Sequence, residues 1–365
     1  MRLKDIELAW RRVWIRALTS ILARRRADRL PDWRRARVLF LRHDRIGDMI
    51  LSTGLLRTIA EAHPGVALDV LASPVNAPVL EHSPAVARTI VFRRGGIGAY
   101  PRIVRALRSR RYDVVIDCMV TAPSLTTLLL MWASGARHRV GVADRGNDAA
   151  YTMLVPRLAW GSHMVERLGS LAGAFGIDPA AADLSPEIVL GDEERINGEA
   201  EWLENGNGNG PDPRLRLLLN VSAGRGHRFW PDDRFVEAVR RANAGQPPLN
   251  VLVIASPDER TRATTVAAAL GGRAVETPTV RHAFALVASA DAVFTPDTSI
   301  AHAASALGKP CVAMYVHETA EEWGLYGADG MNVVSPTREL MSLEVAPVAS
   351  ALRGLLDDVR GGTAR

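Results

Sequence analysis

Short apolar segments and amphipathic segments alternate along this chain, and the alternation restarts once after the middle of the sequence. Nearly continuous apolar runs are typical of strands in a parallel sheet that helices cover on both faces. The chain is therefore expected to be an α/β protein built from doubly wound, Rossmann-like units. Strands are predicted near 37–42, 67–72, 89–93, 112–118, 138–142, 216–221, 250–255, 291–295 and 311–315. Helices are predicted near 48–62, 98–110, 122–133, 162–175, 192–204, 233–243, 257–269, 281–289, 298–307 and 342–357.

A length of 365 residues exceeds one ordinary hydrophobic core, so two domains are expected. The extended segment 184–190 suits a linker, and 205–211 has the asparagine and glycine composition of a loop. We expect two Rossmann-like domains facing a central cleft, which is the natural place for an active site. The expected divisions are a leader, 1–36, an N-terminal domain, 37–186, a C-terminal domain, 187–340, and a C-terminal helix, 341–365, with packing back on the N-terminal domain left open.

The basic character of the chain is concentrated in its leader. The net charge of +5 divides into twelve Arg or Lys against four Asp or Glu in residues 1–37, and 33 against 36 in the remainder. Apolar residues from Trp10 to Leu22 recur at helical spacing among arginines, which predicts a basic amphipathic helix. Two roles stay open: attachment to an anionic lipid surface, or packing on the body of the protein with the basic face in water. Its apolar runs are too short to span a membrane, and no zinc-finger or RNA-recognition pattern indicates nucleic acid.

Several common chemistries are disfavoured because their patterns are missing. Cys118 and Cys311 lie in apolar segments far apart, which indicates a reducing compartment rather than a disulfide framework or a zinc site. No loop ends in Gly-Lys-Ser/Thr, and Gly95-Gly96-Ile97-Gly98 lacks the spacing of a dinucleotide-binding fingerprint. No Asp-x-Asp pair follows a strand, so no metal ion is expected.

The first candidate site follows the first predicted strand. The segment Arg42-His43-Asp44-Arg45-Ile46-Gly47-Asp48 joins that strand to a helix, and ligands bind at the carboxyl ends of strands in such folds. Asp48 is therefore well placed for chemistry. An acid near a helix N-terminus also stabilises the helix dipole, so position alone leaves both roles open.

Two turns in the second half are suited to phosphate. Ser222-Ala223-Gly224-Arg225-Gly226 follows a strand and Arg228 lies just beyond it, so exposed amides and an arginine could hold a diphosphate. The segment from Thr295 to Pro310 predicts a strand end, an N-cap and a small-residue helix whose first amides could hold a second anion. Arg228 could instead be a surface cation, and Asp297 or Thr298 only a helix cap.

The three motifs together resemble glycosyltransferase family 9, the ADP-heptose:lipopolysaccharide heptosyltransferases. The resemblance covers most of 37–340 and rests on Arg42-x-Asp44-x-Ile46-Gly47-Asp48, Arg228-x-Trp230-Pro231 and Pro296-Asp297-Thr298-Ser299-x-Ala301-His302. It implies a GT-B fold, with the acceptor held mainly by the N-terminal half and the ADP-sugar by the C-terminal half. It also implies an inverting transfer without a metal ion or other cofactor, in which Asp48 is the general base.

The resemblance also implies roles for individual residues. The acceptor would meet Arg42, Asp44 and Arg45, although either arginine could instead pair with Asp44. A packed helix histidine is the alternative for His302, and Glu259 would lie near the ribose. A carboxylate must take the proton of the attacking hydroxyl, and cations or amides must neutralise the leaving diphosphate. The donor-binding residues would be Ser222, Gly224, Arg228, Glu259, Asp297, Thr298, Ser299 and His302.

We expect a heptosyltransferase that moves heptose from ADP-heptose to a lipopolysaccharide core acceptor, peripheral on the cytoplasmic face of the inner membrane. Its partners would be a nucleotide-sugar donor, a lipid-linked saccharide acceptor and an anionic membrane surface, without nucleic acid. The alternatives are a family 9 transferase with another donor or glycan, such as capsule or O-chain, and a non-catalytic sugar-nucleotide binding protein.

Overall fold

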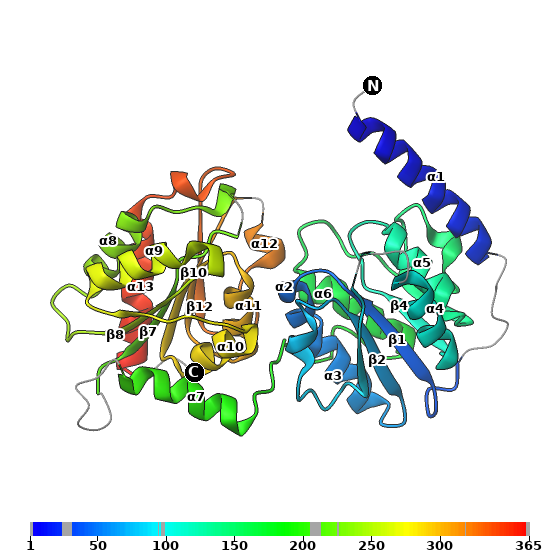
Figure 1. Cartoon of the computed structure of the whole chain (residues 1–365), viewed down its shortest axis with the longest axis horizontal. Coiled ribbons are helices and arrows are strands. Elements are labelled where there is room, and N and C mark those ends of the chain that lie inside the picture. The colour runs from blue at the N-terminus through cyan, green and yellow to red at the C-terminus, as the bar shows by residue number, and fades with distance from the viewer. Residues whose placement is uncertain are drawn as a thin grey trace. The chain divides into compact units, whose positions relative to one another are not determined.

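In a computed structural model, the chain divides into two compact units, Met1–Leu184 and Ser185–Arg365. The expected loop 205–211 and the leader arginines at 24–26 lie outside the residues that the structure describes. Each unit is a parallel sheet with helices on both sides (Figure 1). The structure describes residues 3–23, 31–93, 95, 99–204, 213–224, 226–317 and 319–362.

Unit 1 contains a six-stranded parallel sheet in the order β3-β2-β1-β4-β5-β6. The chain moves outward from β1 in one direction and then from β4 in the other, so the switch point lies between β1 and β4. The strands are β1 (Arg37–Arg42), β2 (Ala67–Ala72), β3 (Arg88–Val91), β4 (Val114–Asp117), β5 (His138–Val142) and β6 (Met153–Val155). The helices are α1 (Leu3–Ala23), α2 (Ile46–Ile50), α3 (Thr53–Ala62), α4 (Ala99–Ser109), α5 (Leu125–Ser134) and α6 (Met164–Gly169), with 3-10 turns η1 (Ala77–Leu80), η2 (Asp148–Ala150) and η3 (Ser170–Phe175).

Unit 2 repeats this arrangement with the order β12-β11-β10-β7-β8-β9, and its switch point lies between β7 and β10. The strands are β7 (Arg216–Asn220), β8 (Asn250–Ile254), β9 (Arg273–Ala274), β10 (Ala292–Pro296), β11 (Cys311–Tyr315) and β12 (Gly330–Val334). The helices are α7 (Asp192–Glu204), α8 (Asp232–Ala242), α9 (Arg260–Leu270), α10 (Val280–Ser289), α11 (Ser299–Ala306), α12 (Ala320–Trp323) and α13 (Val345–Arg360), with 3-10 turns η4 (Gly226–Arg228), η5 (Pro257–Glu259) and η6 (Leu340–Ser342).

Successive residues of the strands supply two hydrophobic cores in unit 2, because side chains alternate between the faces of a sheet. Leu217 and Leu219 of β7 pack with Trp230 and with helices α8 and α13. Leu218, between them, belongs to the opposite core with Trp202 and helix α10. The apolar face of α13 packs within this core of unit 2.

The leader helix α1 divides its apolar residues between two environments. Leu18 and Leu22 are buried in the core of unit 1, where α1 packs on α5 and η2. The buried Arg139 donates from Nη2 to the carbonyl oxygen of Leu22 at 3.1 Å and so satisfies one of the carbonyls near the end of the helix. In contrast, Trp10 and Trp14 have 61% and 52% of their surface exposed. No helix among the described residues is long and apolar enough to cross a membrane.

The differences from the predicted elements are local. The predicted helix 48–62 is two helices, α2 and α3. The strands β6, β9 and β12 were not predicted, and each is an edge strand of its sheet. Edge strands are short or partly exposed, so they lack the continuous apolar run that marks the central strands.

Candidate functional site

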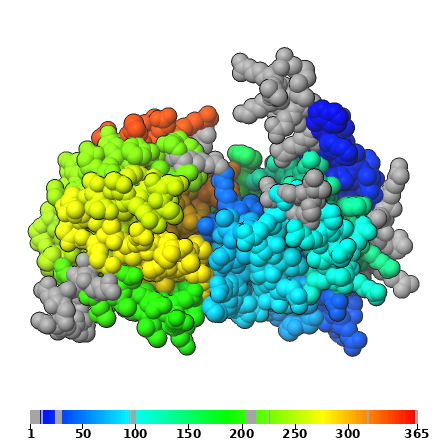
Figure 2. All heavy atoms as spheres, in the orientation of Figure 1, coloured from blue at the N-terminus to red at the C-terminus, as the bar shows by residue number. Residues whose placement is uncertain are grey.

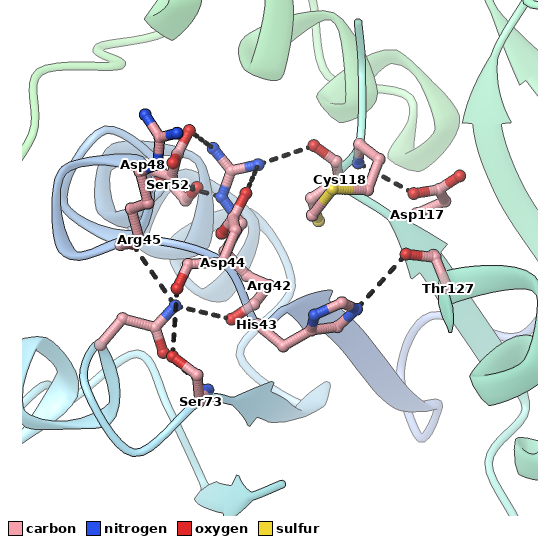
Figure 3. Close-up of polar contacts among 12 residues, drawn as sticks. Arg42, His43, Asp44, Arg45, Asp48, Ser52, Ser73, Asp117, Cys118 and Thr127 are labelled. Carbon is pink, nitrogen blue, oxygen red and sulfur yellow. Dashed lines mark hydrogen bonds and ion pairs between the residues drawn. The ribbon is translucent and has the colours of Figure 1, made fainter. Parts of the chain in front are cut away.

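Arg42 joins the carboxyl ends of β1 and β4 at the switch point of unit 1 (Figure 3). Its side chain is buried, with 3% exposed. Its Nη1 donates to the carbonyl oxygen of Cys118 at 2.8 Å, and its Nε donates to the carbonyl oxygen of Asp48 at 3.0 Å. Its Nη2 lies 3.2 Å from the carboxylate of Asp48, which keeps 14% of its side chain exposed. The guanidinium therefore contacts the buried side of Asp48, and part of the Asp48 carboxylate stays exposed to solvent.

Asp44 and Arg45 lie in the same loop. Nη1 of Arg42 lies 3.4 Å from Oδ2 of Asp44, so the structure shows the ion pair that was one of the two alternatives for Arg42. Burial raises the pKa of Asp44, Arg42 acts against this increase, and the charge of Asp48 adds to it. Arg45 is exposed at the N-terminus of α2. Of the two arginines, Arg45 is thus the one with an accessible side chain.

Three polar side chains that the sequence analysis missed hold this loop in place. The hydroxyl of Ser52 donates to the carbonyl oxygen of Asp48 at 2.7 Å, one helical turn away. Asn76 donates to the carbonyl oxygen of Arg42 at 3.1 Å, and Ser73 donates to that of Asp44 at 3.1 Å. Of these three residues, Ser52 is the one close to Asp48 in sequence, so its contact is the one that the spacing of residues could have predicted.

In unit 2, the turn after β7 is tied to the turn after β8. Gly224 has φ +62°, a left-handed backbone conformation that favours glycine. The hydroxyl of Ser222 accepts from the amide of Ser256 at 2.8 Å. The carboxylate of Glu259 accepts from the amide of Ala223, with its two oxygens at 3.2 and 3.1 Å. Glu259 therefore supports the turn at residues 222–224.

Arg228 and Asp297 connect the two phosphate-suited turns. Nη2 of Arg228 lies 2.8 Å from the carboxylate of Asp297, and Nη1 donates to the Asp297 carbonyl oxygen at 2.6 Å. Their side chains are 19% and 4% exposed, so Arg228 is held by a buried acid and is not a free surface cation. Thr298 is the N-cap of α11, with its hydroxyl accepting from the amide of Ile300 at 3.3 Å. Ser299 is the first residue of that helix, whose first amides have no intrahelical acceptor.

Asn220, the last residue of β7, is a second connection that the sequence analysis missed. Its Nδ2 donates to the hydroxyls of Thr295 and Thr298 at 2.9 and 3.0 Å. Its Oδ1 accepts from the amide of Ser222 at 3.1 Å. Asn220 thus bridges β7 and β10 at the switch point of unit 2. A polar residue ending the apolar run Leu217-Leu218-Leu219 was the available signal.

Two further features lie near these turns. His302 is buried in α11, and its ring centroid lies 6.5 Å from that of Trp323. A cavity of about 150 Å³ lies at the carboxyl ends of β8 and β9, with lining residues that include Ala255, Pro257, Arg260, Thr264 and Thr277. Within the part of the chain that the structure describes, no group of three or more His, Cys, Asp or Glu side chains could hold a metal ion.

A family model described as glycosyltransferase family 9 (heptosyltransferase) matches residues 101–347. The chain belongs to this family. As a family 9 member it is an enzyme, a heptosyltransferase-like glycosyltransferase. The resemblance inferred from the three motifs is thereby confirmed.

Two relatives within family 9 illustrate the sequence similarity. Lipopolysaccharide heptosyltransferase 2 of Salmonella typhimurium is 27% identical over 289 residues, which are 74% of this chain and 80% of that protein. Lipopolysaccharide heptosyltransferase 1 of Pseudomonas aeruginosa is 26% identical over 319 residues, which are 82% of this chain and 84% of that protein.

Solved structures of family 9 confirm the predicted GT-B fold. A glycosyl transferase family 9 structure from Veillonella parvula matches with a TM-score of 0.77 and 16% identity, covering 90% of this chain and 99% of that one. The ADP-heptose lps heptosyltransferase II of E. coli matches with a TM-score of 0.70 and 20% identity, covering 89% of this chain and 99% of that one.

Proposed function

We propose that this family 9 enzyme transfers heptose from ADP-heptose to a lipopolysaccharide core acceptor, with inversion at the anomeric carbon. The observation that carries the proposal is the Asp48 carboxylate, which Arg42 holds at 3.2 Å while part of it stays exposed. A base in a single displacement needs this combination, because it must be fixed and still reach the acceptor hydroxyl.

In the proposed step, the acceptor oxygen bonds to the anomeric carbon as the bond from that carbon to the diphosphate oxygen breaks. The hydroxyl proton passes to Asp48, and the electron pair leaves with ADP. Arg228 and the first amides of α11, at Thr298 and Ser299, stabilise the charge on the diphosphate. The reaction proceeds without a metal ion or other cofactor in this proposal, because these groups already provide charge stabilisation.

The donor lies against unit 2 in this proposal. Ser222 and Gly224 form the turn that approaches the phosphates, and Asp297 keeps the Arg228 fork oriented. The cavity beside Pro257 and Arg260 takes the base, with Glu259 next to the ribose. His302 braces the phosphate turn from inside α11. The acceptor lies against unit 1, where Arg45 is available to an anionic sugar and Asp44 shapes the loop.

We also propose that the enzyme is peripheral on the cytoplasmic face of the inner membrane, where its lipid-linked acceptor is made. Support comes from α1, whose residues Trp10, Val13, Trp14 and Ile21 fall on one side of the helix and are 44% to 61% exposed. Figure 2 shows the described part of α1, in blue, at the surface of unit 1. Tryptophans beside a net charge of +8 in residues 1–37, twelve basic minus four acidic, suit an anionic lipid surface.

A donor panel tests the proposed reaction. The purified chain is mixed with a truncated lipopolysaccharide acceptor and ADP-, UDP- or GDP-sugars, in the presence and absence of a chelator. Turnover with ADP-heptose, unchanged by the chelator, and a product with inverted anomeric configuration by NMR are expected. Turnover with another sugar only supports the other-donor alternative, and binding without turnover supports a binding protein.

The variant Asp48→Ala tests the base. Its turnover should fall by at least about 100-fold while donor affinity is kept. Asp178→Ala, which removes an exposed carboxylate elsewhere in unit 1, is the matched control and should retain turnover. Equal activity of the two variants would remove Asp48 from the proposed mechanism.

A further inference from the structure

A second polar cluster lies in unit 1, at the end of β4. Asp117 and Arg145 form an ion pair at 2.9 Å in which both side chains are 0% exposed. The hydroxyl of Tyr151 donates to the same carboxylate oxygen, Oδ2. That hydroxyl also accepts from Asn147 at 2.9 Å and from Arg145. In the part of the chain that the structure describes, none of these side chains contacts a group that takes part in the proposed reaction directly.

Hydrogen bonds connect this cluster to Asp48. The second carboxylate oxygen of Asp117 accepts from the amide of Met119 at 2.8 Å and so closes a turn around Cys118. The carbonyl oxygen of Cys118 is the group that accepts from Arg42 at 2.8 Å. Arg42 in turn holds both the carbonyl and the carboxylate of Asp48. Figure 3 shows the part of this path from Asp117 to Asp48.

Stability alone does not account for the cluster. Burying an ion pair costs desolvation that its attraction often fails to repay, and apolar replacements of similar volume are frequently as stable. Nη1 of Arg145 and Oδ1 of Asn147 are buried without a hydrogen-bond partner in the described structure, which adds to the cost. Burial, followed by the charge of Asp117, raises the pKa of Tyr151, so its hydroxyl stays a donor to Asp117.

We infer that Asp117, Arg145 and Tyr151 are positioning residues, which set the orientation of Asp48 through the turn at residues 117–119 and through Arg42. The inference rests on the proposed role of Asp48 as the base. The Asp117 carboxylate is held by Arg145, by the Tyr151 hydroxyl and by the Met119 amide. These contacts fix the turn that presents the Cys118 carbonyl oxygen to the Arg42 guanidinium. Misplacement of a catalytic group by about 1 Å can cost as much as 100-fold in rate, so such a support has a measurable effect.

The same sheet contains a matched control. Tyr112 donates its hydroxyl to the buried Asp69 at 2.7 Å, and Arg110 pairs with the same carboxylate at 2.6 Å. Tyr112 precedes β4, whereas Tyr151 bonds to the residue that ends β4. The two clusters therefore share their chemistry but lie toward opposite ends of the strand. Of these two clusters, the Asp117 cluster is the one whose hydrogen bonds among the described residues lead to Asp48.

The test is a double-mutant cycle with Arg42. Tyr151→Phe should lower kcat roughly 10-fold and leave the KM for the sugar nucleotide unchanged, since the proposed donor site lies in unit 2. In an Arg42→Lys background, the same substitution should cause little further loss, because both changes interrupt one path. Tyr112→Phe should reduce the midpoint of urea unfolding by a similar amount but keep kcat within about 2-fold.

A purely structural role predicts different results. In that case Tyr151→Phe and Tyr112→Phe would lower kcat alike, or the losses from Tyr151→Phe and Arg42→Lys would multiply, and either outcome overturns the inference. If Tyr151→Phe fails to fold, Asn147→Ala replaces it, with a smaller kcat loss that again vanishes in the Arg42→Lys background. Failure of the wild-type chain to transfer any sugar would instead overturn the proposed function, and the inference with it.

Discussion

Arg42 holds Asp48 at two points, with Nε donating to its main-chain carbonyl at 3.0 Å and Nη2 lying 3.2 Å from its carboxylate. A lysine has a single ammonium in place of this planar fork and cannot reproduce both contacts together with the one to Cys118. Arg42→Lys should therefore lower kcat by about 10- to 100-fold with donor affinity retained.

The control for this prediction is Arg37→Lys, at the other end of the same strand. Nη1 of Arg37 donates to the carbonyl oxygen of Arg110 at 3.0 Å, far from the loop that carries Asp48. Steady-state kinetics should show nearly wild-type kcat for Arg37→Lys. If the two variants lost equal activity, the Arg42 contacts would not be specific to the site.

Asp44 should make stability depend on pH. Burial raises its pKa above the ordinary value of 3.8, so the folded state holds the proton more tightly than the unfolded state. Its contribution to stability is then complete below about pH 3.8 and is lost as pH rises through the folded pKa. At neutral pH the ionised carboxylate opposes folding, even with Arg42 nearby.

Asp44→Asn should consequently raise the urea midpoint at pH 7 relative to the wild type. The difference should shrink as the pH falls through the folded pKa of Asp44 and vanish below about pH 3.8, where the carboxyl is neutral in both states. Urea unfolding at several pH values measures this, with Asp178→Asn as the control for an exposed carboxylate. Parallel pH curves for the wild type and Asp44→Asn would contradict the prediction.

Asn220→Ala should weaken donor binding. It removes the bonds that join the turn after β7 to Thr295 and Thr298, so the two groups of amides lose their common support. The loss of about 1.4 kcal/mol expected for such bonds corresponds to roughly a 10-fold higher donor Kd by calorimetry. Asn250→Ala, a buried asparagine at the start of β8, should affect stability but not the donor Kd.

Trp10→Ser/Trp14→Ser should reduce binding of the full chain to phosphatidylglycerol vesicles without changing turnover on a soluble acceptor. The two indoles are exposed on α1, and indoles bind the interface of anionic bilayers. Ile196→Ser/Leu203→Ser removes similarly exposed apolar side chains from α7 and should leave vesicle cosedimentation intact. Equal vesicle binding by the wild type and both variants would exclude α1 as the membrane contact. Equal binding of the wild type to neutral phosphatidylcholine vesicles would show that attraction to anionic lipid is not required.

Much of the central architecture could be predicted from local sequence. The strands β1, β2, β5 and β11 have the predicted bounds, because a short segment with several apolar residues between polar turns is a local property of the sequence. The turn chemistry around Gly224 and the N-cap at Thr298 are also local, since they depend on one residue and its neighbours. The three motifs, in their order along the chain, were sufficient to predict the family.

The partners of the functional side chains were decided only by the tertiary structure. Arg42 reaches Cys118 across 76 positions, and Asn220 reaches Thr295 across 75, because parallel strands bring their carboxyl ends together at the switch points. Local spacing contains no information about such pairs. The leader follows the same rule: sequence periodicity predicted one apolar stripe, and packing on α5 buried Leu22 but left Trp10 exposed. Sequence determined which elements form and what chemistry they can offer, whereas the long-range register of the sheets decided which groups meet.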